Sequence, residues 1–241
     1  MICVALCAGK GSRLGDLTTE VPKTLLEVET GKTILDTIFD GVSPHVDRIV
    51  IVAGYLSEVL MQAVGERTDL DVPVDLHIVD DVDRWNNARS LWSVLREMDD
   101  DVLVANGDTV VHPTATASLL AGAEGFDVAL AMDGVKTLGE EEMKVLIDAG
   151  GNIEQISKLL DPSSAHGEYI GQSVISASAI EAVTSHLETA WQRDPQNYYE
   201  DGYQVAVDAG MSVGAVRLPD LPWTEVDDVI DLNVARSLTW L

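Results

Sequence analysis

The sequence predicts an α/β domain in which helices flank a mixed, mostly parallel sheet. Short apolar runs alternate with amphipathic stretches through the first half of the chain, and most of these runs are apolar on both faces, as buried parallel strands are. Such strand–helix–strand alternation implies right-handed crossovers between parallel strands. After residue 133 the pattern changes to hairpin-like segments, so the complete sheet is expected to be mixed.

Five apolar runs predict the strands of the first half: ICVALC (2–7), RIVIVAG (48–54), VDLHIVD (74–80), DVLVAN (101–106) and DVALAM (127–132). Four amphipathic stretches predict helices near 33–42, 57–65, 86–98 and 113–121. In the third of these, Leu91, Leu95 and Met98 recur at helical spacing, which places them on one face.

The second half predicts a hairpin over 143–157 that turns at Gly150-Gly151, followed by a strand in EYIGQSVIS (168–176). Later segments predict helices near 176–190 and 200–209, a strand at 212–218 and a closing helix from about 227. No Pro/Ser-rich linker interrupts the 241 residues, so one domain over 1–241 is expected.

Acidic residues dominate the charge of the chain. It has 15 Lys and Arg against 41 Asp and Glu, a formal net charge of −26. Such a field argues against nucleic-acid binding and against docking on anionic membranes, and a polyphosphate ligand would need local cations or a metal ion. The excess also favours a halophilic protein in a cytoplasm of molar salt, where self-repulsion is screened. An ordinary acidic enzyme is the alternative.

Cysteine use and hydropathy favour a cytoplasmic protein. Cys3 and Cys7 would lie on one face of the first strand about 13 Å apart, too far for a disulfide, so both are interpreted as buried small hydrophobes. The longest apolar runs have the length of strands, so no transmembrane helix is predicted. The first run lacks a basic leader, which argues against a signal peptide. A homodimer is left open.

Polar features follow three of the predicted parallel strands. They are the loop after the first strand, Asp80-Asp81 after the third and NGDT (106–109) after the fourth. Ligands of open α/β sheets bind beyond the carboxyl ends of the strands. We therefore expect these three strand ends to be adjacent and to form one site.

The first loop lies within LCAGKGSRLGDLTTEVPKTLLEV (6–28) and holds unusual positive charge for this chain. Gly9 and Gly11 allow a tight turn whose N–H groups can bind an anion. Arg13 offers a planar fork for phosphate oxygens. Pro22 stiffens the segment that presents Lys23, which is expected to be exposed.

The pattern A-G-x-G-[ST]-R-L…P-K-x-L resembles the signature of nucleotidyltransferases that activate sugar phosphates and related alcohol phosphates. It is present as Ala8-Gly9, Gly11-Ser12-Arg13-Leu14 and Pro22-Lys23-Thr24-Leu25, with Cys7 where the family usually has Ala. The resemblance implies a single Rossmann-like (GT-A-type) domain, with a nucleotide-binding half of about 1–110 and an acceptor-binding half of about 111–241. It also implies that Arg13 meets the β- and γ-phosphates and that Lys23 neutralises phosphate at the reacting centre.

A second segment indicates the branch of the family. Sugar-phosphate uridylyl- and thymidylyltransferases carry Q-P-x-G-T/L-A after the third strand, whereas this chain has DRWNNARSLW (83–92). That segment resembles N-N-x-x-S-[LM] of phosphocholine cytidylyltransferases and related phosphonate cytidylyltransferases. The resemblance therefore implies CTP as the nucleotide. The implied nucleotide contacts are Leu6, Ala8, Gly9, Gly11, Ser12, Arg13, Asn86, Asn87 and Ser90. Asn86 as a mere helix cap is the alternative.

The resemblance gives the metal role to Asp108 and Asp227, and hard carboxylate oxygens are what Mg²⁺ prefers. Glu225 would share a strand face with Asp227, as a ligand or a neighbour of one. The implied reaction is attack of a phosphate or phosphonate oxygen on the α-phosphorus of CTP with release of pyrophosphate. Because the nucleophile is already anionic, positioning and charge neutralisation suffice.

The acceptor is less determined. We expect it to be bound by Lys144, Glu168, Tyr169, Glu200 and Trp223. Aromatic faces near the site suit a quaternary ammonium group, although core packing is their commoner role. Choline phosphate, an aminoalkyl phosphonate and a polyol phosphate stay open. Alternatives are a sugar-1-phosphate nucleotidylyltransferase using UTP or dTTP, a nucleotide-sensing subunit without activity, and a glycosyltransferase with D-x-D at 81–83.

Overall fold

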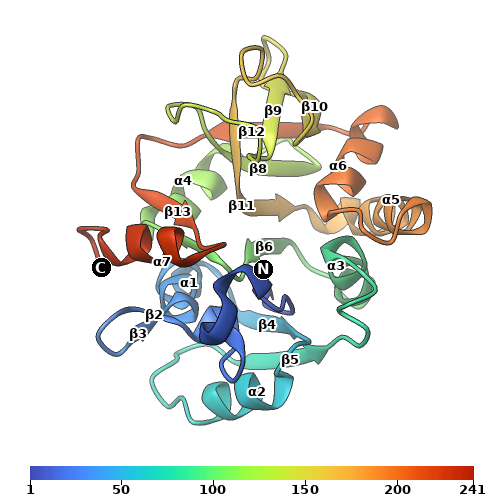
Figure 1. Ribbon diagram of the computed structural model, residues 1–241. Helices are drawn as coiled ribbons and strands as arrows, with labels where there is room; N and C mark the ends of the chain where they lie inside the picture. The colour runs from blue at the N-terminus through green and yellow to red at the C-terminus, as the bar shows by residue number, and fades with distance from the viewer.

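A nine-stranded mixed sheet organises the computed structural model, which describes residues 1–241 (Figure 1). Seven strands follow in the order β10-β9-β11-β6-β1-β4-β5, and β8 joins β11 to β12. Their bounds are β1 Ile2–Leu6, β4 Arg48–Ala53, β5 Val74–Ile78, β6 Val102–Asn106, β8 Val128–Asp133, β9 Lys144–Ile147, β10 Ile153–Ser157, β11 Gly167–Ile175 and β12 Val213–Arg217. Two small sheets pair β2 (Glu27–Glu29) with β3 (Lys32–Thr33) and β7 (Thr109–Val111) with β13 (Trp223–Glu225).

Strand β11 joins the two parts of the sheet. On one side β6, β1, β4 and β5 are parallel, and their buried Val, Ile and Ala residues need helices on both faces. β11 runs antiparallel to β6, β8 and β9, and its pairing with β8 shifts between Tyr169 and Ser173. Gly171 lies in this bulge with φ +78°, a conformation that favours glycine.

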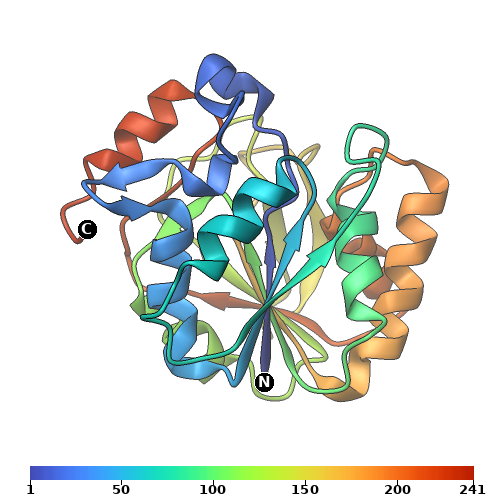
Figure 2. The ribbon, with the colours of Figure 1, turned by 90° about the horizontal axis from the view of Figure 1, so that it is seen from below.

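Helices cover both faces of the sheet (Figure 2). One face packs against helices α1 (Ile34–Val42), α2 (Ser57–Gly65), α4 (Thr114–Gly122) and α7 (Val229–Arg236). The other packs against α3 (Asn87–Leu95), α5 (Ile180–Arg193) and α6 (Tyr199–Asp208). The two apolar cores therefore lie on opposite sides of the sheet, since residues such as Ile49 and Val50 alternate between them. The predicted α/β domain with a mixed sheet is confirmed.

Most predicted elements are present, with small differences at their ends. The predicted helix at 86–98 ends at Leu95, and the helix predicted over 176–190 begins as a 3₁₀ turn and continues to Arg193. The closing helix begins at Val229 because Asp228 caps it, accepting hydrogen bonds from the N–H groups of Ile230 and Asp231. Cys3 and Cys7 are both buried and unpaired, as predicted. None of the helices has the length and apolar character needed to cross a membrane.

Candidate active site

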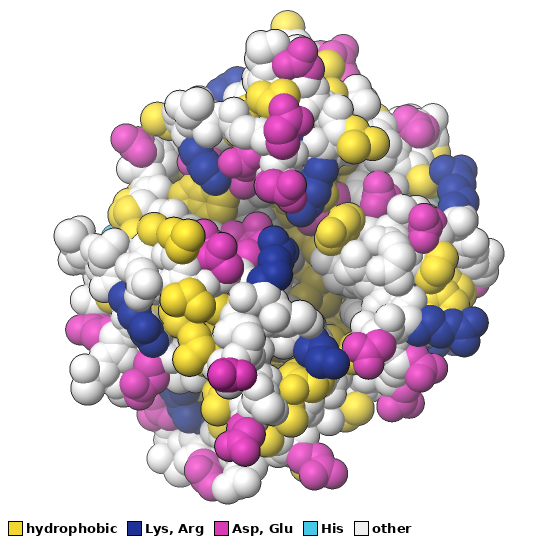
Figure 3. Space-filling view, in the orientation of Figure 1, with side chains coloured by type: hydrophobic (Ala, Val, Ile, Leu, Met, Phe, Trp, Pro, Cys, Tyr) yellow, Lys and Arg dark blue, Asp and Glu magenta, His cyan; other side chains and the backbone are white.

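A cavity of about 400 Å³ opens at the carboxyl ends of β1 and β6. Its walls come from the first loop, the start of α3, the segment 106–109, strand β11, the start of α6 and strand β13. Figure 3 shows the hollow near the centre of one face, with both Lys or Arg and acidic side chains around it. The site thus lies where the parallel and antiparallel parts of the sheet meet.

The structure brings every predicted nucleotide contact to this cavity. Lining residues include Leu6, Ala8, Gly9, Gly11, Ser12, Arg13, Asn86, Asn87 and Ser90. The expectation for Asp80-Asp81 was wrong, because both are exposed outside the cavity. The reason is sheet order: β4 lies between β1 and β5, so the end of β5 is not adjacent to the first loop. Only the residues that follow, from Val82 on, reach the site.

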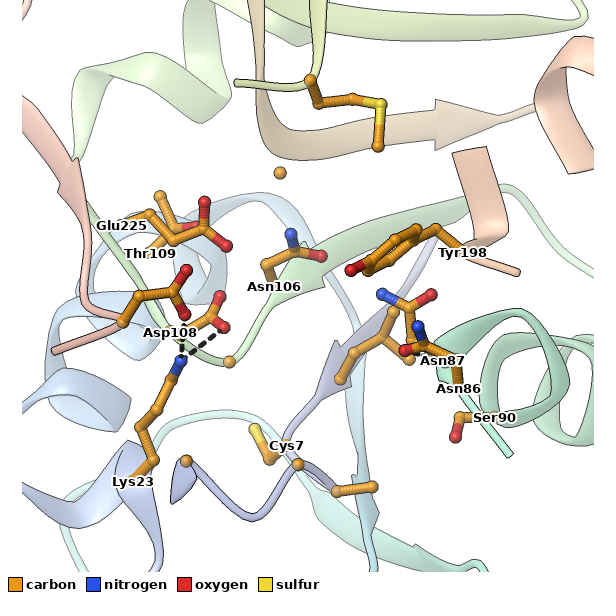
Figure 4. A pocket seen from close by; sticks show the side chains of 18 of the residues that line it. Cys7, Lys23, Asn86, Asn87, Ser90, Asn106, Asp108, Thr109, Tyr198 and Glu225 are labelled. Carbon is orange, nitrogen blue, oxygen red and sulfur yellow. Dashed lines mark hydrogen bonds and ion pairs between the residues drawn. The ribbon is translucent and has the colours of Figure 1, made fainter. Parts of the chain in front are cut away.

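Lys23 lies at the centre of a charged cluster at one end of the cavity (Figure 4). Its Nζ is 2.9 Å from Oδ2 of Asp108 and 3.0 Å from Oδ1 of Asp227, and Nη2 of Arg13 is 2.8 Å from Oδ2 of Asp227. Burial lowers the pKa of Lys23, but the two carboxylates outweigh it and raise that pKa overall. The expected exposure of Lys23 was wrong, since its side chain is only 12% exposed.

Three carboxylates surround a point suited to a cation. Oxygen atoms of Asp108, Glu225 and Asp227 lie within 4.8 Å of one another. Oδ1 of Asp108 is buried without a hydrogen-bond partner. Burial, together with the negative charges of Asp108 and Asp227, raises the pKa of Glu225 to about 8. Lys23 and Arg13 pair with only part of this negative charge, and a hard divalent cation relieves the remaining repulsion between the carboxylates, so these residues fit Mg²⁺.

The two asparagines at the start of α3 are partly used by the fold. Asn86 caps the helix: its Oδ1 accepts from the N–H of Asn87, and its Nδ2 donates to the carbonyl of Gln196. Oδ1 of Asn87 accepts from the N–H of Tyr199, whereas its Nδ2 has no partner within the chain. Asn87 is therefore the one with a free donor on the cavity side.

Of the residues expected to bind the acceptor, Glu168, Tyr169, Glu200 and Trp223 line the cavity, but Lys144 does not. Lys144 is completely buried, and its Nζ donates to the carbonyls of Gly139, Glu140 and Glu142. An ammonium group with three backbone acceptors is fully satisfied where it is. The assignment of Lys144 to the acceptor was wrong, because the residue holds the 139–142 loop.

Aromatic faces at the cavity are already covered by cations of the chain. Nζ of Lys158 lies 5.0 Å from the centroid of Tyr198, and Nζ of Lys136 lies 5.1 Å from that of Trp223. Trp85 has two guanidinium groups within 4.9 Å. The remaining aromatic groups at this end, Tyr169 and Tyr199, are buried and hydrogen-bonded to each other. Tyr198, Trp223 and Trp85 therefore each have a cation of the chain close to the ring, which competes with a quaternary ammonium group for it.

The sequence reasoning missed several lining residues, including Lys158 and Asn106. Lys158 follows β10, lines the cavity and pairs with no carboxylate. Asn106 ends β6, and its amide lies in the middle of the site (Figure 4). The sequence held a signal for each of these two residues. Lys158 directly follows the predicted hairpin, and Asn106 is the first residue of the NGDT segment.

Comparison with known proteins gives the family. A model of the MobA-like NTP transferase domain matches residues 3–141, more than half of the chain. The chain belongs to this family. The predicted nucleotidyltransferase domain is thereby confirmed, and the loop signature, which lies within the matched residues, identified it correctly.

Several curated relatives match over different parts of the chain. CMP-5'-(3-aminopropyl)phosphonate synthase of Streptomyces rubellomurinus is 26% identical over 245 residues, covering 96% of this chain and 38% of the relative. UTP–glucose-1-phosphate uridylyltransferase AglF of Haloferax volcanii is 33% identical over 113 residues, covering 46% of this chain and 45% of the relative. The chain thus spans less than half the length of these relatives.

Solved structures share the fold across the whole chain. The inositol-1-phosphate CTP transferase from T. maritima superposes with a TM-score of 0.81 at 21% identity, covering 98% of this chain and 95% of that one. CTP:phosphocholine cytidylyltransferase LicC from Streptococcus pneumoniae gives a TM-score of 0.76 at 20% identity, with 96% of both chains covered. At such identities the likeness establishes the common fold.

Proposed function

We propose that this chain is a Mg²⁺-dependent cytidylyltransferase that transfers CMP from CTP to a small phosphorylated alcohol or phosphonate and releases pyrophosphate. The observation that carries the proposal is the Lys23 cluster. Two cations suited to phosphates and three carboxylates suited to a divalent cation meet at one end of a cavity behind a glycine-rich loop. Nucleotidyl transfer needs this combination, because negative charge builds up on phosphate oxygens as the bonds change.

The chain's own residues bind and neutralise the triphosphate. The loop of Gly9 and Gly11 offers N–H groups, Arg13 binds the β- and γ-phosphates, and Lys23 neutralises the reacting α-phosphate. Asp108 and Asp227 would hold Mg²⁺, with Glu225 beside them. When bound, the ion supplies further neutralisation of phosphate oxygens. Arg13 and Lys23 then exchange their carboxylate partners for the phosphates.

The nucleophile is the anionic oxygen of the acceptor. It attacks the α-phosphorus, and the bond from that phosphorus to the bridging oxygen of pyrophosphate breaks. No proton has to be removed, so no general base is required and in-line positioning carries the step. Lys158 is the unpaired cation on the acceptor side, and we assign it to the acceptor phosphate or phosphonate.

Cytosine is the proposed base, with the free Nδ2 of Asn87 as its reader. A donor fixed in this position suits cytosine, whose N3 accepts a hydrogen bond, and opposes uracil, whose N3–H donates. The name of the Streptomyces relative, which matches nearly the whole chain, points to the same nucleotide. The second candidate is a sugar-1-phosphate uridylyltransferase, which the Haloferax relative favours through its higher identity over part of the chain.

The acceptor is proposed to bind in the half formed by residues from about 111, against Glu168, Tyr169, Glu200 and Trp223. Oε2 of Glu200 is buried and unpartnered, so it suits a hydroxyl or primary amine of the acceptor. The covered aromatic faces disfavour choline phosphate relative to a polyol phosphate or an aminoalkyl phosphonate. Use of CTP and two unpaired thiols suit the cytoplasm.

Pyrophosphate release from CTP, UTP, dTTP, ATP and GTP, each with a panel of acceptors and Mg²⁺, tests the proposal. The assay should be run in dilute and in molar KCl, because a chain of net charge −26 favours high salt. We expect turnover with CTP and a polyol phosphate or aminoalkyl phosphonate. Turnover with UTP and sugar 1-phosphates alone would select the second candidate, and absence of turnover with every pair would refute both.

A further inference from the structure

Asn106 occupies the middle of the cavity. It ends β6, two residues before Asp108, and its side chain lies between the Lys23 cluster on one side and Asn87 and Tyr198 on the other (Figure 4). A group at this place is within reach of both substrates, because the nucleotide and acceptor ends meet there. The roles proposed above leave this residue unassigned.

The carboxamide of Asn106 is held in one orientation by a buried chain of hydroxyl groups. The hydroxyl of Tyr199 donates to Oδ1 of Asn106 over 2.8 Å, and the hydroxyl of Tyr169 lies 2.9 Å from that of Tyr199. Tyr199 has one hydroxyl proton and gives it to a carbonyl oxygen that can only accept. Tyr169 must therefore donate to Tyr199, so the chain of hydrogen bonds runs from Tyr169 through Tyr199 to Asn106.

This orientation leaves the donor end of the carboxamide available. Nδ2 of Asn106 has no hydrogen-bond partner within the chain, although the residue lines the cavity. Gly171 gives this end its room, since a Cβ at position 171 would lie 2.7 Å from Nδ2. The bulge of β11 thus makes space for an amide donor that the fold itself does not use.

We propose that Asn106 donates a hydrogen bond through Nδ2 to a phosphate oxygen of a bound substrate, and that Tyr199 is its positioning residue. Phosphate oxygens only accept, so an amide with the opposite orientation would turn its carbonyl oxygen toward them and repel them. The Tyr199 hydroxyl prevents that rotation. The inference rests on the proposed function to the extent that the cavity takes phosphorylated substrates.

Tyr199 also connects the two ends of the site. Its hydroxyl orients Asn106, while its backbone N–H donates to Oδ1 of Asn87 at the start of α3. The side chain is completely buried, so the phenol contacts no substrate itself. Both proposed amide donors, Nδ2 of Asn87 and Nδ2 of Asn106, therefore depend on the placement of one residue of α6.

The test compares Asn106→Leu, Tyr199→Phe, the double variant and the control Tyr203→Phe. Tyr203 is matched to Tyr199: it is a fully buried tyrosine of α6, but its hydroxyl lies 2.8 Å from Oγ of Ser173, a residue that does not line the cavity. Equilibrium titrations with CTP and, separately, with inorganic phosphate, both with Mg²⁺, distinguish the nucleotide from the acceptor phosphate as the source of the oxygen. Melting temperatures are measured for each variant.

We expect Asn106→Leu to weaken the binding of at least one probe about 10-fold or more, the scale of a hydrogen bond to a charged group. Tyr199→Phe should weaken binding of the same probe several-fold in the wild-type background. In the Asn106→Leu background it should leave that binding unchanged, because Tyr199 acts through Asn106. Tyr203→Phe should lower the melting temperature comparably without weakening either probe.

Equal binding by Asn106→Leu and wild type would overturn the inference, as would equal effects of Tyr199→Phe and Tyr203→Phe. So would a wild-type protein that binds neither probe. Failure of the proposed function gives a different result: the wild type would bind the probes and show these variant effects, yet release no pyrophosphate with any pair of substrates.

Discussion

The two ends of the cavity differ in how their charged groups are paired. At the end proposed to bind the nucleotide, Lys23 and Arg13 are paired with carboxylates brought from distant parts of the chain, so both cations already have partners of opposite sign. At the proposed acceptor end, Glu200 is buried with Oε2 unpartnered, and only Glu168 is paired, with Lys136. Lys158 lines this end without any carboxylate partner.

We therefore expect the two ends of the cavity to bind different kinds of ligand. Without a substrate, these cations and carboxylates pair with each other. A metal–triphosphate complex carries both signs of charge, so its phosphates can replace the carboxylates as partners of the cations, and its metal ion can replace the cations as partner of the carboxylates. A buried carboxyl without a cation instead awaits a hydrogen-bond donor, because leaving a buried polar atom unpaired costs about 1–3 kcal/mol. We therefore expect the proposed nucleotide end to be electrostatically preorganised and the proposed acceptor end to select its ligand by hydrogen bonding.

The largest effect should follow from loss of a carboxylate in the paired cluster. Asp108→Asn and Asp227→Asn should each abolish Mg²⁺-dependent pyrophosphate release, because an amide is a poor ligand for a hard cation. The circular dichroism spectrum should be unchanged, since each aspartate reaches the cavity rather than the core. Asp228→Asn, at the cap of α7, is a neighbouring control that should keep its Mg²⁺ response. A retained response in Asp108→Asn or Asp227→Asn would remove that residue from the metal site.

Lys23→Ala should lower turnover about 10²-fold or more, the scale for losing one preorganised charge contact. It should also lower the melting temperature, because Asp108 and Asp227 then repel each other without their cation. Added Mg²⁺ should restore more stability to this variant than to the wild type. Lys10→Ala, an exposed cation of the same loop outside the cavity, is the control. Near-normal turnover of Lys23→Ala would contradict the assignment.

The nucleotide end was largely predictable because its features are local. Glycines, Arg13 and the Pro22-Lys23 pair lie within one loop, and loop chemistry can be interpreted from spacing alone. The burial of Lys23 was not predictable, since it depends on Asp227, which is 204 residues away. The order of strands, which removes Asp80-Asp81 from the site, depends equally on tertiary pairing.

The acceptor end was harder to predict for the same physical reason. Lys144 begins a strand, and sequence cannot tell that its ammonium group turns to carbonyls of the preceding loop. Aromatic residues were identified near the site, but the cations that cover them belong to other segments, such as Lys136 over Trp223. Asn106 becomes a candidate only when Tyr199 is known to hold its amide.

A smaller effect should separate the two asparagines of α3. Asn87→Ser removes the amide donor and should reduce the preference for CTP over UTP by about 1–3 kcal/mol in competing kcat/KM measurements. Asn86→Ser keeps a capping hydroxyl but loses the bond to Gln196, so it should lower the melting temperature slightly without changing base preference. Unchanged preference in Asn87→Ser would remove this residue from base recognition.

The smallest expected effect concerns Glu200, which lies outside the Lys23 cluster. It is the sharpest check on the proposed acceptor end. Burial, with a smaller contribution from the charge of Asp201, raises the pKa of Glu200 to about 8 against the opposing effect of Lys158. In the unfolded chain the same carboxyl titrates near its ordinary pKa of about 4.3. Between these values the folded protein holds a proton that the unfolded chain releases. The free energy of unfolding should therefore fall as pH rises between these two pKa values. Below both values, the stabilisation that Glu200 contributes is fully present.

Glu200→Gln removes this proton while keeping the shape of the neutral carboxyl. Between these two pKa values the wild type should lose about 1.4 kcal/mol of stability per pH unit more than the variant, the value for one proton. Other groups with raised pKa, including Glu225, contribute equally to both proteins and cancel in the difference. Denaturant unfolding at pH 5, 6 and 7 measures it. Parallel curves for the two proteins would mean that Glu200 is ionised in the folded state, which would favour the protonated amine of an aminoalkyl phosphonate over the hydroxyl of a polyol phosphate as its partner.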